Sequence, residues 1–273
     1  GAVLAACDLS GARLAEADLD SADLAEVVAE GADFSGACLA AVRLDRAELT
    51  QAVLAGADPS AASLYLANLS GLDLRTVRVS HETTFEAAKL AGADLRGFAF
   101  HGCTLKNADL GGAQLQGALL SLVRGYQLEL TGANLTDAKL LRADLRAADL
   151  SGSMLADADL GGADLRGAQF RKIIALRARF ALGSLSRSQW SDADLREAVF
   201  DHADLRLSAI ERSLMLAASF REANLEGCSL YGSAPEGADF EGANLANVSW
   251  TDAGRAKAEA FQPMRAQALG EQP

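Results

Sequence analysis

Apolar residues recur every five positions along almost the whole chain. Leu or Phe stands at Leu4, Leu9, Leu14, Leu19 and Leu24, and then at Phe34, Leu39, Leu44, Leu49 and Leu54. In each five-residue unit we number positions relative to this apolar centre, i. Position i−2 holds a small residue, usually Ala, and position i−1 is often Asp or Asn. Repetition at a fixed period is the signature of repeat architectures, and it decides the fold class here.

The register of this repeat is interrupted once. It holds from Leu4 to Val79, one extra residue within Ser80–Thr84 shifts it, and it then holds from Phe85 to Trp250. The sequence therefore predicts one repeat domain over residues 1–251, built from about fifty pentads, and a separate segment over 252–273.

The pentads carry a specific motif. Ala17-Asp18-Leu19, Ala93-Asp94-Leu95, Ala133-Asn134-Leu135 and Ala223-Asn224-Leu225 show the unit. The chain resembles the pentapeptide-repeat family, whose motif is A(D/N)LXX, over nearly its whole length. The resemblance implies an all-β fold, a right-handed quadrilateral β-helix with four pentads per coil and about twelve coils. With strands about 4.8 Å apart, such a rod is about 60 Å long.

The repeat also predicts which side chains are buried. The centre and position i−2 are expected to turn inward, leaving i−1, i+1 and i+2 in solvent, and only a small residue is expected to fit at i−2. Two prolines and two tryptophans, Trp190 and Trp250, occupy centres and depart from the pattern. Pro59 and Pro235 cannot donate a ladder hydrogen bond, which predicts local distortion, and Trp190 is expected either to strain its coil or to turn partly outward.

The two ends of the rod are expected to differ. Residues 252–261 are typical of a short helix with Asp252 as N-cap, ending before Pro263, which would cover the open end of the β-helix. The first residues are already in register, so no cap is visible there. An uncapped sheet edge invites end-to-end self-association, unless another segment precedes Gly1 in the natural protein.

Composition and net charge limit the kinds of partner that we expect the chain to bind. The net charge is −12 and the isoelectric point is about 4.7, which argues against direct nucleic-acid binding because phosphate contacts need a basic surface. A basic partner or a mimic of DNA stays open. Four widely spaced Cys residues indicate neither a zinc site nor disulfides, which fits the cytoplasm, or a secreted effector if the chain is part of a longer protein. No apolar run approaches membrane-spanning length, and no cofactor motif is present.

The least expected outward residues are apolar. They fall at solvent positions of two adjacent faces, in the middle and later coils, and such a patch usually marks a partner surface. Two alternatives stay open, that a loop or an absent domain covers them, or that these coils depart from the register. The candidate partner-binding residues are Leu119, Leu122, Leu141, Ile174, Leu176, Leu182, Leu214 and Leu216.

A column of cations forms a second candidate. Lys106, Arg146, Arg166 and Arg206 share position i+1 of one face, and Asp144, Asp164 and Asp204 stand beside three of them. The first interpretation is a ladder of surface ion pairs, each contributing little to stability. The alternative is a strip that binds anions or acidic groups.

The sequence offers no catalytic motif and predicts a protein that is not an enzyme. The first functional hypothesis is a protein–protein interaction scaffold or adaptor, alone or within a larger bacterial effector or secretion-associated protein. The alternative, implied by the family resemblance, is a DNA-mimicking protein that binds DNA gyrase and protects it against quinolones or toxins. A third hypothesis makes the chain the substrate-recognition part of a longer enzyme.

Overall fold

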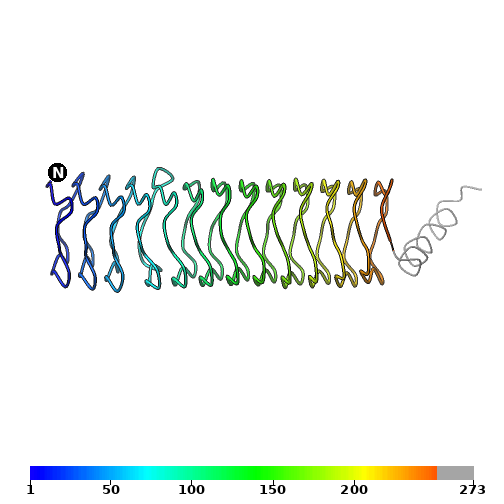
Figure 1. Cartoon of the computed structure of the whole chain (residues 1–273), viewed down its shortest axis with the longest axis horizontal. Helices are drawn as coiled ribbons and strands as arrows, with labels where there is room; N and C mark the ends of the chain where they lie inside the picture. Colours follow the sequence, from blue (N-terminus) through cyan, green and yellow to red (C-terminus); the bar gives the residue numbers. More distant parts are fainter. Residues whose placement is uncertain (251–273) are drawn as a thin grey trace, which may run out of the picture.

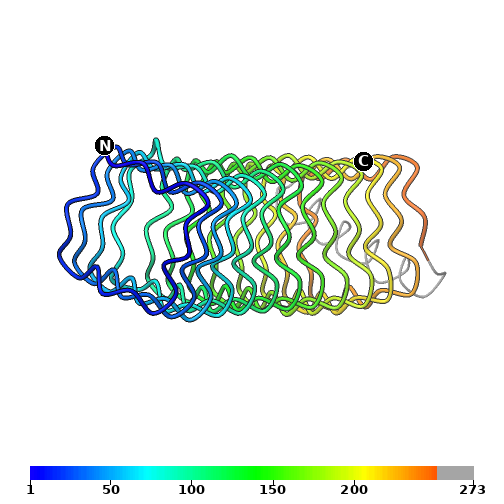
Figure 2. The same cartoon turned by 60° about the vertical axis from the view of Figure 1, so that its left-hand side comes forward.

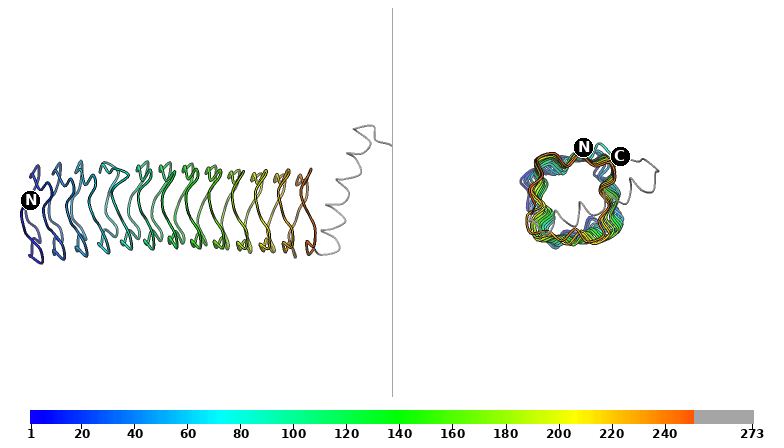
Figure 3. Two further views of the ribbon diagram at one scale, coloured as in Figure 1. Left: turned by 90° about the horizontal axis from the view of Figure 1, so that it is seen from above. Right: turned by 90° about the vertical axis from the view of Figure 1, so that its right-hand side faces the viewer.

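The protein is a straight rod of stacked square coils. The computed structural model describes residues 1–250. Successive coils lie side by side along one axis, with the N-terminal coil at one end (Figure 1). The stack keeps this order when the rod is turned (Figure 2), and viewed along the axis the coils superimpose as a four-sided outline (Figure 3).

Backbone hydrogen bonds between successive coils hold the rod together. Within residues 1–250 there are no helices and no extended strands, and each side of a coil contributes a single-residue parallel bridge to the next coil. Along most of the chain bridged residues are 20 positions apart, from Val3 with Asp23 to Ser229 with Ser249. Each bridge carries two bonds, as where Leu4 N donates to Asp23 O at 2.8 Å and Asp23 N donates to Ala2 O at 2.8 Å. Most buried backbone groups are thereby paired with other backbone groups rather than with side chains.

A tight turn at each corner fixes which residues can stand there. The N–H at i+3 donates to the carbonyl at i, as from Cys7 N to Leu4 O at 3.1 Å. Residue i+2 has a positive φ, which is typical of a type II turn and disfavours β-branched side chains. No Val, Ile or Thr is among the positive-φ residues of the described chain, and Thr76, which occupies an i+2 position, does not have a positive φ.

The Asp or Asn at i−1 stabilises this turn from outside. Its side-chain oxygen accepts a hydrogen bond from the backbone N–H at i+1. Examples are Ser10 N to Asp8 Oδ1 at 2.9 Å, Ser35 N to Asp33 Oδ1 at 2.9 Å, and Gly111 N to Asp109 Oδ1 at 2.8 Å. Asp and Asn are short enough to bond the backbone two residues on, so their frequency at i−1 has a local structural cause.

The core is a column of Leu, Phe and Ala, but the expectation that only small residues fit at i−2 is wrong. Phe98, Leu128 and Ile173 occupy i−2 and are buried. Two of them face a reduced centre: Leu128 follows Gly125, and Ile173 precedes Ala175. A Cβ on Gly125 would lie 3.2 Å from Leu128 Cδ2, so the larger side chain fills the space that the Gly leaves. The summed volume of the neighbouring buried side chains is therefore conserved, although the size of the residue at each single position is not.

The register shift lies between Arg78 and Thr84. The bridges that cross it, Ser63 with Thr84, Asn68 with Lys89 and Asp73 with Asp94, join residues 21 positions apart, and the 20-residue spacing resumes with the bridge from Thr84 to Thr104. Pro59 is buried beneath this irregular coil, so its missing N–H coincides with the place where the regular ladder is interrupted. Thr83 is buried and its hydroxyl donates to Pro59 O at 3.1 Å. A narrow apolar cavity of about 20 Å³ lies nearby, lined by Leu54, Pro59, Val77 and Phe85 among others.

Trp190 neither turns outward nor stays without a partner. It is fully buried, stacked on Phe170 with ring centroids 3.8 Å apart, and it meets Phe180 edge-on at 5.1 Å. Its indole N–H donates to Ser188 Oγ at 2.6 Å, and the Ser188 hydroxyl donates to Leu185 O. The corner after Trp190 is opened by Ser213, whose hydroxyl accepts from Ala193 N at 3.1 Å and donates to Trp190 O at 2.6 Å. Polar residues at i−2 thus accommodate the indole ring.

Two expectations concern the C-terminal end of the chain. The first is the local distortion expected at Pro235. Pro235 lies in the last described coil, and the position 20 residues further on, with which it would pair, belongs to 251–273. The helix expected over 252–261, with Asp252 as N-cap, also lies outside the described residues. End-to-end association through the first coil stays a prediction.

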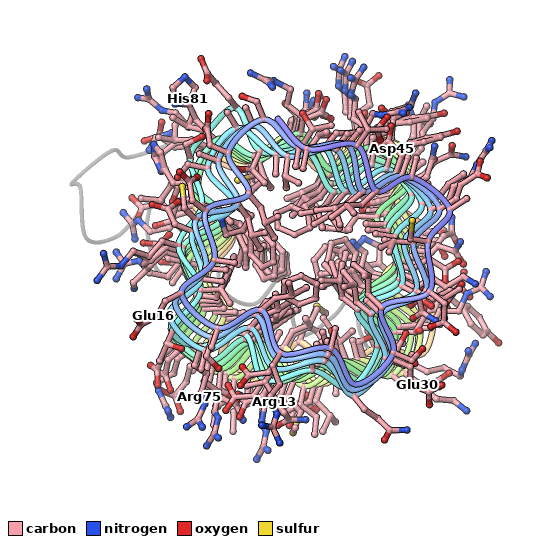
Figure 4. All side chains as sticks on the ribbon, turned by 90° about the vertical axis from the view of Figure 1, so that its left-hand side faces the viewer. Arg13, Glu16, Glu30, Asp45, Arg75 and His81 are labelled. Carbon is pink, nitrogen blue, oxygen red and sulfur yellow. The ribbon has the colours of Figure 1, made fainter. Side chains whose placement is uncertain are left out.

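Four faces organise the outer surface, and residues are assigned to them by the bridges. Face 1 contains the centres Phe85, Leu145 and Leu205; face 2 contains Leu110, Leu150 and Trp190; face 3 contains Leu95, Leu135 and Leu195; and face 4 contains Leu120, Phe180 and Phe220. Figure 4 looks along the rod with Asp45, Glu30, Glu16 and His81 labelled at the four corners. Face 3 is the side between Glu30 and Glu16, which carries Arg13 and Arg75, and face 4 is the side between Glu16 and His81. Charged side chains point outward, and the Leu, Phe and Ala side chains of the core point inward.

Candidate protein-binding surface

The eight apolar candidates fall into two groups on different faces. Leu119, Leu122, Leu141 and Leu182 belong to face 4 and to its corner with face 1, whereas Ile174, Leu176, Leu214 and Leu216 belong to face 3 and to its corner with face 4. Seven of the eight are exposed, and Leu176 is half-buried. The structure therefore keeps them outside the core and divides them between two neighbouring faces.

The face 4 group, which we call the leucine corner (Leu119, Leu122, Leu141 and Leu182), lies where most coils have small or polar residues. Leu122 and Leu182 occupy the positive-φ turn position, with φ of 61° for both. Leu182 is 70 % exposed, the highest value among the eight candidates. Between the coils of Leu141 and Leu182 the corner is Gly161-Gly162, and Leu141 Cδ2 lies 3.2 Å from the place a Cβ on Gly161 would take. The Leu141 side chain therefore lies over the glycine backbone of the next coil.

Cations without carboxylate partners surround the leucine corner. Lys139, Arg142 and Arg179 take part in none of the ion pairs of the described chain. Residues 121–180 contain nine Lys or Arg and seven Asp or Glu, a net charge of +2 in a chain whose total is −12. The middle of the rod is therefore locally suited to an acidic partner.

The face 3 group forms two outward pairs. Ile174 and Leu176 flank one centre, and Leu214 and Leu216 flank the centre two coils further along. Asp194 and Arg196 stand in the coil between them. Sequence reasoning missed Met154, which is 39 % exposed and pairs with Ile174 in the ladder, and also Tyr126, Leu207 and Tyr231 on other corners. Applying the same outward-position test to every large apolar residue would have found them.

The charged column of face 1 consists of residues that already have partners. Arg146 donates through Nε and Nη2 to both oxygens of Asp144, each at 2.7 Å. Arg166 with Asp164 and Arg206 with Asp204 repeat this geometry, and Lys106 Nζ contacts Glu86 at 3.0 Å. Tyr126 breaks the column and lies under the Arg146 guanidinium, 5.8 Å from its ring centroid. These arginines are oriented by carboxylates of their own coil.

The Asp–Arg pairs predict a pH dependence of stability. The hydrogen bonds from Arg75 lower the pKa of Asp73 to about 2, and Arg96 and Arg196 likewise lower the pKa of Asp94 and Asp194. A carboxyl with a depressed pKa in the folded state stabilises above its unfolded pKa of about 3.9, and loses that contribution as pH falls towards the folded value. We expect the melting temperature to be flat above about pH 5 and to fall from about pH 4 to 2.

Melting followed by circular dichroism tests this expectation with two variants. Arg75→Gln should make the decline between about pH 4 and 2 shallower, whereas Arg179→Gln, which removes a cation with no carboxylate partner, should leave it unchanged. An identical acid limb in wild type and Arg75→Gln would contradict the assigned cause.

The described residues offer few groups suited to metal binding or nucleophilic chemistry. No group of three or more His, Cys, Asp or Glu in residues 1–250 could hold a metal ion. The thiols are free, and burial raises the pKa of Cys103 to about 12 and that of Cys228 to about 11, which makes both poor nucleophiles. No helix among these residues has the length and apolar character needed to cross a membrane.

Comparison with protein families is decisive for the fold. A family model described as pentapeptide repeats matches residues 7–44, 43–80, 85–121, 129–172, 177–208 and 218–253, in eight copies. The chain belongs to the pentapeptide-repeat family. Pentapeptide-repeat proteins fold as right-handed quadrilateral β-helices, in agreement with the square coils and parallel bridges of this chain.

Solved structures of pentapeptide-repeat proteins match along much of the rod. HetL, involved in heterocyst differentiation regulation in the cyanobacterium Nostoc sp. strain PCC 7120, is 29% identical, with 91% of this chain and 86% of HetL covered and a TM-score of 0.21. A trypsin-treated variant of QnrB1, a plasmid-mediated fluoroquinolone resistance protein, is 20% identical, with 85% and 94% covered and a TM-score of 0.40. A pentapeptide-repeat protein of the Arabidopsis thaliana thylakoid lumen is 26% identical, with 47% and 71% covered and a TM-score of 0.17. No curated protein matches the sequence.

Proposed function

We propose that this pentapeptide-repeat protein is a non-catalytic scaffold that binds a protein partner on face 4, through the leucine corner and the cations beside it. The observation that carries the proposal is the coincidence of four exposed leucines with three cations that have no carboxylate partner. A partner segment with apolar side chains and several Asp or Glu residues satisfies both features. The cytoplasm, or a target cell if the chain is part of a longer effector, is the location we propose.

The energetics of such a surface fit a specific interface. Fully burying a Leu side chain is worth roughly 1.5–3 kcal/mol, and the four leucines are 41–70 % exposed, so covering each of them supplies part of that value. The cations add orientation and a faster encounter with an acidic segment rather than most of the affinity. Because each coil is hydrogen-bonded to its neighbours, the surface is already ordered, and binding costs little conformational entropy on this side.

The alternative, a DNA-mimicking protein that binds gyrase, has less support from the charge distribution. Residues 1–60 contain eleven Asp or Glu and three Arg, and residues 181–250 contain eleven acids and five Arg. Acidic charge is thus concentrated at the two ends of the described rod, with a slightly basic segment between them. Duplex DNA carries its charge evenly along its length.

Capture of partners from an extract of the source organism tests the proposal with matched variants. Leu122→Asp with Leu182→Asp places carboxylates at the leucine corner, and Asp tolerates the positive φ of both positions. We expect the partner recovered by wild-type protein to be reduced at least about tenfold with this variant, because apolar contact is lost and an acidic partner is repelled.

Leu207→Asp is the control. Leu207 occupies the same turn position with a φ of 58° and is 56 % exposed, but it lies at the corner of faces 1 and 2. It should retain the partner. Equal capture by both variants would contradict the face 4 site. If the captured partner were a topoisomerase subunit, the acidic segments 1–60 and 181–250 would become the candidate binding surface. The DNA-mimicry alternative would then be favoured.

A further inference from the structure

Face 3 carries a pattern that runs without interruption through more coils than on any other face. On the outside of each coil two side chains flank the buried centre, one at i−1 and one at i+1. On face 3 these two residues match in kind through nine successive coils, either apolar with apolar, polar with polar, or Asp with Arg. The pairs are Val53 with Ala55, Asp73 with Arg75, Asp94 with Arg96, Gln114 with Gln116, Asn134 with Thr136, Met154 with Ala156, Ile174 with Leu176, Asp194 with Arg196, and Leu214 with Leu216.

The other three faces break this match. Face 1 matches through the five successive coils from Asp144 to Glu226, but it sets Arg124 beside Tyr126 and has no pair of large aliphatic residues. Face 2 sets Asp109 beside Gly111, and face 4 sets Lys139 beside Leu141. The regular pentad therefore does not by itself require matched flanking residues.

Matched columns are what a two-fold interface between identical chains requires. We infer that face 3 is the contact surface of a parallel, side-by-side homodimer. A two-fold axis along the rod, placed over the centres of face 3, exchanges the i−1 column of one protomer with the i+1 column of its partner. Apolar residues then meet apolar residues in the same coil, and every Asp meets an Arg.

The charges select this orientation over the antiparallel one. In an antiparallel dimer centred on the coil of Asp194, each column would face itself, which brings Asp194 against Asp194 and Arg196 against Arg196. In the parallel dimer each Asp194 faces Arg196 of the other protomer. Arg196 already donates through Nε and Nη2 to Asp194 of its own chain, at 2.8 and 2.7 Å, so its Nη1 is the group left to meet the opposite carboxylate.

The apolar pairs supply the driving force in this arrangement. Ile174 is 48 % exposed, Leu214 is 50 % exposed and Leu216 is 54 % exposed, and all three become covered. The Asp–Arg pairs are expected to fix the register rather than to add much affinity, since desolvation offsets their attraction. The matched strip spans eight coil steps, about 38 Å at about 4.8 Å per step. Face 4 stays open, so this dimer is independent of the proposed partner site.

Cross-linking tests the contact and its orientation together. The background carries Cys7→Ser and Cys38→Ser, because those two thiols are exposed. Single variants Ile174→Cys, Leu176→Cys and Leu214→Cys are mixed in pairs and oxidised. The parallel dimer predicts a disulfide-linked species of twice the 28.4 kDa chain mass for 174 with 176. Preferential linkage of 174 with 214 would overturn the parallel arrangement.

Charge exchange provides a second readout by sedimentation. Asp194→Arg alone and Arg196→Asp alone each place like charges across the axis, and each should weaken self-association at least about tenfold. An equimolar mixture of the two variants restores Asp–Arg contacts between unlike chains and should recover association. If Asp194 and Arg196 acted only within one chain, mixing the variants would not recover it. Wild-type protein that sediments as a monomer at about 100 μM would overturn the inference.

Discussion

Replacing Trp190 with Ala is expected to lower the free energy of unfolding by about 3–5 kcal/mol, the cost of emptying a large aromatic site in a packed core. The ring is fully buried and contacts Phe170, Phe180 and Phe200, and Phe200 continues a stacked column through Phe220 and Phe240 with centroids 4.8 and 5.0 Å apart. Loss of the indole therefore removes contacts with three rings in two adjacent coils. Chemical denaturation followed by circular dichroism measures the effect.

Ser188→Ala is the control for the Trp190 variant. It removes the acceptor of the indole N–H but leaves the ring packing, so it should cost about 1–3 kcal/mol, the penalty of one unsatisfied buried donor. A Trp190→Ala protein that unfolds at the wild-type denaturant concentration would show that the aromatic column does not stabilise these coils.

A second large effect is expected where a reduced centre and an enlarged i−2 residue compensate each other. Leu128→Ala should destabilise by about 2–5 kcal/mol through the cavity that it leaves. Gly125→Leu should destabilise by about 1–3 kcal/mol, because its Cβ would lie 3.0 Å from Leu145 Cδ2 and 3.2 Å from Leu128 Cδ2. In the double variant the new Leu occupies the space freed at 128.

The double variant distinguishes volume compensation from independent effects. We expect its loss of stability, measured by denaturation, to be smaller than the sum of the two single losses by at least about 1 kcal/mol, because the two sites share one space. Strict additivity would mean that Leu128 and Gly125 are not coupled, and that the exchange of sizes has no energetic role.

Most of the fold could be predicted from the repeat, because one five-residue unit determines the turn, the backbone hydrogen bonds between coils and the direction of each side chain. Leu19, Ala93 and Asp94 could be placed from their position in the pentad alone. The outward leucines were identified in the same way, since any apolar residue at i−1, i+1 or i+2 departs from the pattern. These predictions needed only local information.

The remaining features depend on contacts between pentads and were outside the reach of the motif. Leu128 is tolerated at i−2 because Gly125 is small, and Trp190 is buried because serines at i−2 bond its indole and open its corner. Both require knowledge of what lies across or above in the coil. The division of the eight apolar candidates between two faces likewise follows from stacking order, and it separates the leucine corner from the matched columns of face 3.

Hydrogen–deuterium exchange on the complex with the captured partner tests the central claim most directly, since it locates the binding surface on the intact rod. A binding site on face 4 predicts added protection of backbone amides around 119–122, 139–142 and 179–182, with no change near Leu207 or in residues 1–60. Protection confined to the acidic first coils, with face 4 exchanging as in the free protein, would contradict it.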